Sequence, residues 1–155
     1  MNDFINGIHY GQPGFTDVFP DTQENREKYY DSPLGPRGLV QVQQLGNSVR
    51  RLRNGDESAA AELSLRPEHR SILEEIDLIV CSPLSRALQT MDQGLYPNLQ
   101  PKKLPVVAVP HAAERIYLIS DLGKSRRELK REYPYVDFDT AFPSSIGEEI
   151  GRAHV

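Results

Sequence analysis

The sequence has little of what marks secreted, membrane or metal-thiolate proteins. Its 155 residues contain one cysteine, Cys81, which excludes an internal disulfide framework and a thiolate cage for zinc or an iron–sulfur cluster. No stretch approaches the roughly 20 apolar residues that cross a membrane, and residues 1–6 lack the basic and then apolar order of a secretory signal. We therefore expect a cytoplasmic protein without a membrane partner.

A strong basic excess is also missing. The formal net charge is -4 and the pI is about 5.6, whereas general nucleic-acid binders are strongly basic. The basic clusters at 50–53 and 124–127 are therefore interpreted as solvated helix faces. The partners that remain are small molecules or proteins, and nucleic acid is not expected.

The residues that are present suit one domain of short elements. Hydrophobic residues make up 38% of the chain, enough for a core. Twelve prolines and eleven glycines interrupt it, so the loops must be numerous. These breakers are dense in the first thirty-odd residues, which we interpret as loop.

Two kinds of apolar pattern then alternate along the chain. Spacings of three and four predict a helix that ends at Asn54-Gly55, and further helices are expected within 56–66, 68–75, 82–94 and 124–132. Continuous apolar runs at 76–81 and 104–109 predict strands, with the first buried on both faces. The alternation predicts an α/β fold. The apolar residues of the first helix are Leu39, Val42, Leu45, Val49 and Leu52.

The segment that follows the first strand carries the candidate chemistry. Ser82 is predicted to cap a helix that begins at Pro83, which leaves the amides of Leu84 and Ser85 directed beyond the carboxyl end of the strand, where ligands of open α/β sheets bind. Arg86 lies in the same first turn, where a cation is disfavoured unless an anion offsets it. Two readings stay open: Arg86 binds an anion such as phosphate, or it is solvated or paired with a carboxylate elsewhere.

Three segments, in order, resemble the histidine phosphatase superfamily, the phosphoglycerate mutase-like proteins. Residues 82–90 resemble its S-P-x-x-R-A-x-Q-T segment. Residues 31–42 resemble its D-x-x-L-T-x-x-G-x-x-Q-A helix entry, with Gly35 in place of threonine. Residues 114–134 are similar to the E…D-T-G…E-L-K…F-P stretch of fungal-type members, with Leu122 in place of threonine.

The resemblance implies a three-layer α/β/α sandwich with a mainly parallel sheet and phosphoryl transfer through a phosphohistidine, without a metal or other cofactor. It places Arg86 and Ser82 at the phosphate, although capping is the plainer role for Ser82, and it makes Glu114 the general acid or base. Arginine neutralises phosphoryl oxygens and a carboxylic acid protonates the leaving oxygen. The implied partner is a small phosphorylated metabolite or a phosphoprotein.

The family's nucleophile motif, Arg-His-Gly, is absent from the sequence. One alignment of the N-terminal region puts His9 at the arginine position and Tyr10 at the nucleophile, and the other leaves Phe4 near the nucleophile. His69, His111 and His154 lack the required setting and are predicted to be surface residues. We expect negligible catalysis from this chain. The preferred interpretation is that it is part of a phosphatase whose complete version hydrolyses or transfers phosphate, and the alternative is a non-catalytic phosphate-binding or interaction protein.

The C-terminal hexapeptide at 150–155 resembles a translated sequencing adapter. We interpret residues 1–149 as a partial histidine phosphatase-like domain and residues 150–155 as a non-native tail. The domain is expected to be incomplete at both ends, because the family's first strand and its second histidine are not found. Genomic sequence at Glu149 would decide the origin of the tail.

Overall fold

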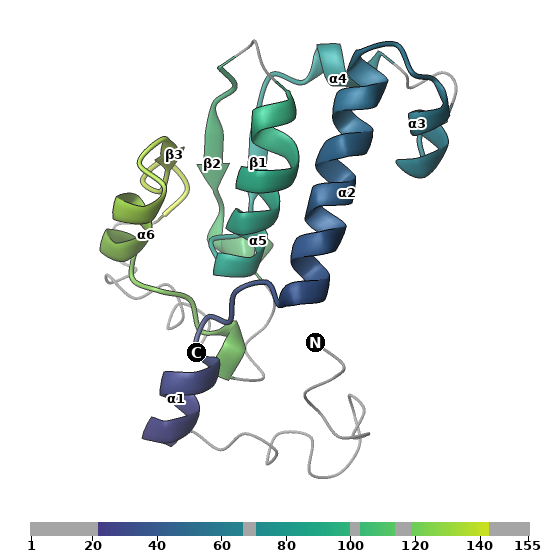
Figure 1. Cartoon of the computed structure of the whole chain (residues 1–155). Helices are drawn as coiled ribbons and strands as arrows, with labels where there is room; N and C mark the ends of the chain where they lie inside the picture. Colours follow the sequence, from purple (N-terminus) through teal and green to yellow (C-terminus); the bar gives the residue numbers. More distant parts are fainter. Residues whose placement is uncertain (1–21, 67–70, 100–102, 114–118, 143–155) are drawn as a thin grey trace.

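A computed structural model describes residues 22–66, 71–99, 103–113 and 119–142. Its sheet is parallel, with strands β1 (Ile79–Cys81), β2 (Val106–Ala108) and β3 (Val136–Asp137) in the order β1-β2-β3. Helices separate the strands along the chain (Figure 1). The predicted α/β class and the two predicted strands are therefore confirmed, although both strands are shorter than their apolar runs.

Six α-helices and four short helical turns are described. The α-helices are α1 (Gln23–Tyr29), α2 (Pro36–Arg53), α3 (Ser58–Glu62), α4 (Ile72–Glu75), α5 (Ser85–Thr90) and α6 (Arg126–Glu132). The turns are the π-helical η3 (Met91–Leu95) and the 3-10 turns η4 (Tyr96–Asn98), η5 (Pro110–Ala112) and η6 (Ile119–Asp121).

Helix α2 confirms the prediction made from its periodicity. Val42, Val49 and Leu52 are buried on its inner face, while polar residues of the opposite face are exposed. The helix ends at Asn54, and Gly55 has a φ of 88°, a left-handed conformation that suits glycine after a helix C-terminus.

Two glycines let α2 approach η3 closely. A methyl group added at Gly46 would lie 2.8 Å from Asn98 Nδ2 and 3.2 Å from the carbonyl oxygen of Gly94. A methyl group at Gly94 would lie 3.1 Å from Leu45 Cδ2 and 3.3 Å from Val42 Cγ1. Larger side chains at either position would push the two helical segments apart.

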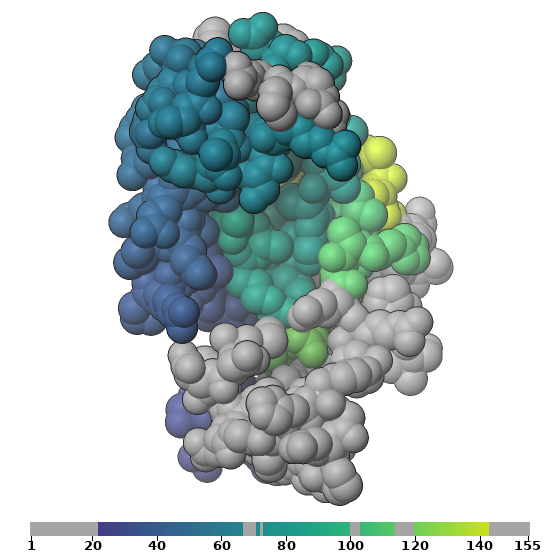
Figure 2. All heavy atoms as spheres, turned by 90° about the vertical axis from the view of Figure 1, so that its right-hand side faces the viewer, coloured from purple at the N-terminus to yellow at the C-terminus, as the bar shows by residue number. Residues whose placement is uncertain are grey.

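One core joins the helices to the sheet. Leu88 of α5, Leu129 of α6 and Phe138 after β3 are fully buried in it, together with strand residues Ile79 and Val106. In the space-filling view (Figure 2), the blue atoms of α2 and α3 form one wall of a hollow, with teal and green atoms on its floor and opposite wall. Each described helix is too short or too polar to span a bilayer.

Strand β1 corrects the prediction that it is buried on both faces. Ile79 is buried, but Val80 is 56% exposed and the preceding Leu78 is 49% exposed. Side chains alternate along a strand, and Ile79 points to the face that packs on the core. The apolar run therefore predicted the strand correctly, but its prediction that both faces are buried was wrong, because one face is exposed.

Two further elements were not predicted, and the end of one predicted helix was wrong. Residues 23–29 form α1 rather than loop, with Thr22 Oγ1 accepting a hydrogen bond from the Asn25 amide at 3.2 Å. This helix buries no side chain, so it has no apolar stripe to reveal it. Helix α3 ends at Glu62 rather than at the Arg66-Pro67 step, and Ser64 then takes a φ of 54°. Strand β3 was not predicted, because two residues are too few for a pattern.

Candidate functional site

The polar residues of interest gather at the carboxyl edge of the sheet. Strand β1 leads through Ser82-Pro83 into α5, and the loop before α2 and the turn η6 lie at the same end of the molecule (Figure 1). The carboxyl edge is where open α/β folds bind ligands. The prediction that residues 82–90 start at this edge is confirmed.

The start of α5 differs from the prediction in its capping. The helix begins at Ser85, with Leu84 rather than Ser82 at the N-cap. Ser82 Oγ instead accepts a hydrogen bond from the Leu84 amide at 3.3 Å, which is a local turn. The Ser85 amide also has an acceptor, the Asp31 carboxylate. The two amides predicted to point into open space are therefore both directed at side chains of the chain itself.

Arg86 lies in the first turn of α5, as predicted, and is oriented by η6. Its Nη1 donates to the Ser120 carbonyl oxygen at 2.9 Å, and its Nη2 lies 3.2 Å from Asp121 Oδ1. The side chain of Arg86 is 20% exposed and that of Asp121 is 6% exposed. Of the two readings that the sequence left open, pairing with a carboxylate is thus observed, and Asp121 offsets the repulsion between Arg86 and the helix dipole. The Arg86 side chain stays 20% exposed, and the pairing does not test the predicted phosphate role.

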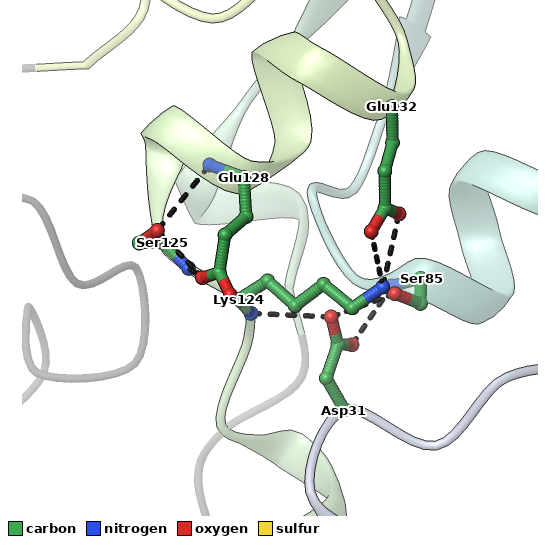
Figure 3. Close-up of polar contacts among 6 residues, drawn as sticks. All are labelled: Asp31, Ser85, Lys124, Ser125, Glu128 and Glu132. Atoms are coloured by element: carbon green, nitrogen blue, oxygen red, sulfur yellow. Dashed lines mark hydrogen bonds and ion pairs between the residues drawn. The ribbon is translucent and has the colours of Figure 1, made fainter.

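Among the described charged residues, Asp31 is the most buried at this edge. It is 1% exposed and has a φ of 41°. Its Oδ1 accepts a hydrogen bond from the Ser85 amide at 2.8 Å, and its Oδ2 accepts from Ser85 Oγ at 2.7 Å and from the Lys124 amide at 3.1 Å. Figure 3 shows the carboxylate between these two groups. A buried carboxylate is stable only when it is hydrogen-bonded in this way.

The entry to α6 forms the other side of the close-up in Figure 3. Ser125 and Glu128 make a capping box, in which Ser125 Oγ donates to Glu128 at 2.6 Å and accepts from the Glu128 amide at 3.3 Å. The bonds from Ser125 lower the pKa of Glu128. Lys124 Nζ lies 2.8 Å from Glu132. These contacts fix the direction in which the chain leaves Lys124.

Two further hydrogen bonds tie distant segments to this edge. Gln89 Oε1 of α5 accepts from the Leu34 amide at 2.8 Å. Tyr30 Oη donates to the Gly123 carbonyl oxygen at 2.6 Å. The three segments that resemble the histidine phosphatases therefore contact one another in this structure, at the edge that carries Arg86.

Cys81 ends β1 beside the site. Burial raises the pKa of its thiol to about 11, which keeps it protonated at neutral pH. The half-buried thiol contacts the Val107 carbonyl oxygen at 3.9 Å. Cys81 therefore acts as a small, partly buried hydrophobic residue.

Several predicted residues lie outside the described part of the chain. They include Glu114, the proposed acid or base, together with His9, Tyr10, His69, His154 and the tail at 150–155. His111 is described and is exposed, as predicted. Over the described ranges, no three histidine, cysteine or carboxylate side chains lie close enough to bind a metal.

Sequence reasoning missed Asp31 and Asp121 as site residues. Asp31 is the first residue of the motif at 31–42, but nothing in the sequence indicated that its carboxylate is buried. Its role as a hydrogen-bond acceptor depends on partners 54 and 93 residues away. Asp121 followed the same pattern, since its arginine lies 35 residues earlier.

Comparison with known proteins gives one informative similarity. A protein of Schizosaccharomyces pombe named as a "Probable phosphatase" is 28% identical over 103 residues, which are 63% of this chain and 47% of that protein. The chain spans about half the length of this curated relative. No family model and no solved structure matches the chain. The chain is therefore similar to a protein that is classed by name as a phosphatase.

Proposed function

We propose that this chain provides the phosphate-binding part of a phosphatase of the histidine phosphatase superfamily, with the three-layer sandwich of that family. The observation that carries the proposal is the place of Arg86: the segment 82–90 runs from the carboxyl end of β1 into α5, so this arginine lies at the carboxyl edge of a parallel sheet. Open α/β folds commonly bind ligands at that edge. The similarity to the Schizosaccharomyces pombe protein named as a probable phosphatase supports the same class.

The chemistry assigned to the residues follows from their types. Arg86 offers a planar fork of N–H donors to phosphoryl oxygens, and the hydroxyl of Ser82 lies in the local turn that precedes α5. Glu114 serves as the acid or base that handles the proton of the leaving oxygen. The substrate class is a phosphate monoester, carried by a small metabolite or a phosphoprotein. The phosphohistidine step belongs to a longer protein that contains an Arg-His-Gly strand.

The second candidate is phosphate binding without turnover, and a specific observation favours it. The 155 residues contain no Arg-His-Gly, and arginine and glutamate alone bind and polarise a phosphoryl group without forming a covalent intermediate. In this reading the carboxyl edge is a binding or interaction surface. Both candidates require Arg86 to bind phosphate, and they differ in whether a longer protein turns it over.

The first experiment is a calorimetric titration of the purified chain with inorganic phosphate and with orthovanadate. We expect binding that falls at least about tenfold in Arg86→Ala, the loss expected for one charge-assisted contact. Arg51→Ala is the matched control, because Arg51 is also paired with a carboxylate, Asp56 at 2.8 Å, but lies near the far end of α2. Equal binding by the wild type and Arg86→Ala would reject the proposed site.

A chromogenic phosphate ester separates the two candidates. This chain should not hydrolyse it, and turnover that disappears in Arg86→Ala would contradict the reasoning from the missing nucleophile. A longer natural version that contains an Arg-His-Gly strand should show vanadate-sensitive hydrolysis if the phosphatase reading is correct. Absence of hydrolysis from that version, with phosphate binding retained, would favour the non-catalytic reading.

A further inference from the structure

The hydrogen bonds of Asp31 connect the segment that carries Arg86 with the segment that binds its guanidinium. Ser85, which gives it two hydrogen bonds, directly precedes Arg86 in the first turn of α5. Lys124, which gives it the third, lies three residues after Asp121 in the segment that receives the guanidinium. One carboxylate thus connects the backbone that carries the arginine to the backbone that orients it.

We propose that Asp31 is the positioning residue of this site: its buried carboxylate fixes the start of α5 against the segment 120–124 and so sets where the Arg86 guanidinium points. The inference rests on the proposed function, because positioning matters for ligand binding only if Arg86 binds phosphate. The resemblance assigns no such role to Asp31.

The backbone of Asp31 supports a role beyond general packing. Its φ of 41° lies in the left-handed region, which an aspartate adopts at some energetic cost and keeps only when its surroundings hold it there. The conformation turns the carboxylate inward to Ser85 and Lys124 (Figure 3). The neighbouring Tyr30 secures the same loop through its 2.6 Å hydrogen bond to Gly123.

The geometry also explains why a neutral or longer side chain would not serve. Ser85 donates through its amide and its hydroxyl to separate oxygens, at 2.8 and 2.7 Å, and Lys124 shares the second oxygen. An asparagine has one acceptor oxygen, so its NH2 group would replace the other oxygen and would face the amide of Ser85 or of Lys124, which is itself a donor. A glutamate would move the same oxygens outward by one methylene in a fully buried space.

The test measures the position of Arg86 separately from ligand binding. In Asp31→Asn, the Arg86 Nε–H signal in a nitrogen-15 NMR spectrum should shift in the absence of any ligand, and the affinity for inorganic phosphate should fall roughly tenfold, as for the loss of one charge-assisted bond. Asp56→Asn is the control. Asp56 also accepts bonds from an arginine, a serine amide and a serine hydroxyl, but at the far end of α2.

Three outcomes would overturn the inference, and a fourth would reject only the proposed function. An unchanged Arg86 signal in Asp31→Asn, or a shift of equal size in Asp56→Asn, rejects positioning. If Asp31→Asn fails to fold, Ser85→Ala decides, since it removes only the 2.7 Å bond to Oδ2, and an unshifted Arg86 signal there rejects positioning as well. If the signal shifts but the wild type binds no phosphate, Asp31 positions Arg86 and the proposed function is wrong.

Discussion

The ion pair between Arg86 and Asp121 makes a quantitative prediction about stability. The nitrogen and oxygen lie 3.2 Å apart, and the two side chains are 20% and 6% exposed. For charge centres near 4 Å in an effective dielectric of 20, the attraction is about 4 kcal/mol before the cost of desolvation. Desolvation offsets part of this attraction, so we expect a coupling free energy of about 1 to 3 kcal/mol.

The two single substitutions should differ in their cost. Arg86→Met leaves a nearly buried carboxylate without its guanidinium, which we expect to lower the free energy of unfolding by about 3 kcal/mol. Asp121→Asn leaves an arginine that still donates to the Ser120 carbonyl oxygen and is reached by water. Its cost should be smaller, about 1 to 2 kcal/mol.

Urea denaturation of the wild type, both single variants and the double variant measures the coupling. The double variant should lose less stability than the sum of the single losses. The pair Arg51 and Asp56 is the control, because both side chains are about 40% exposed, and its coupling should be too small to resolve. Additive losses at Arg86 and Asp121, or a larger cost for Asp121→Asn than for Arg86→Met, would refute the reasoning.

Three shorter predictions concern the surrounding fold. Gly46→Ala should destabilise the chain by about 1 to 3 kcal/mol in urea, because the new methyl meets Asn98 at 2.8 Å. At pH 8.5, Cys81 should react with a thiol reagent about 100-fold more slowly in the folded chain than in the unfolded chain, because folding raises the pKa of its thiol from 9.0 to about 11. Ser125→Ala should cost about 1 kcal/mol at pH 7. Because the pKa of Glu128 is lowered in the folded chain, the stabilisation from its ionised form is present above its ordinary pKa and lost as pH falls through the folded value.

A specific outcome would contradict each of these three predictions. Gly38→Ala, whose new methyl would meet only the flexible Leu34 side chain among its nearest neighbours, should be tolerated, and an equal loss there would remove the argument from close helix approach. Equal reactivity of Cys81 in water and in urea would show that its thiol is not protected. A cost of Ser125→Ala that is unchanged below pH 4 would show that Glu128 does not take part in the cap.

Local patterns predicted those elements whose stability is local. Helix α2 was predicted from its regular apolar stripe. The segment 124–132 was predicted as a helix, and the structure gives it as Arg126–Glu132 with a serine cap and a glutamate three residues later. The α/β class followed from two apolar runs between helices. Helix α1 and strand β3 were missed because neither carries a periodic apolar face. Strand β3 pairs with β2, and α1 contacts η6, so the partners of both lie far away in the sequence.

The candidate site was predicted in part. Arg86 was identified from its turn and its motif, but its partner was not, since no local pattern connects residues 86 and 121. Ser82 was expected to cap α5, whereas the Ser82-Pro83 step is followed by one more residue, Leu84, before the helix begins at Ser85. The acceptor for the Ser85 amide comes instead from Asp31, a residue that only the folded chain brings to α5.

The parallel register of the sheet has a consequence for the order of folding. Ile79 pairs with Val106 and Val106 pairs with Val136, so each ladder joins residues roughly thirty positions apart. Closing such loops costs entropy before any contact repays it, and chains rich in distant contacts fold slowly. We expect contacts between neighbouring elements, such as the hydrogen bond that Ser48 of α2 donates to Glu62 of α3 fourteen residues later, to form early and the sheet to form late. The carboxyl edge of the sheet then forms together with the slowest contacts. An anion that binds there can therefore stabilise the native fold but cannot initiate folding.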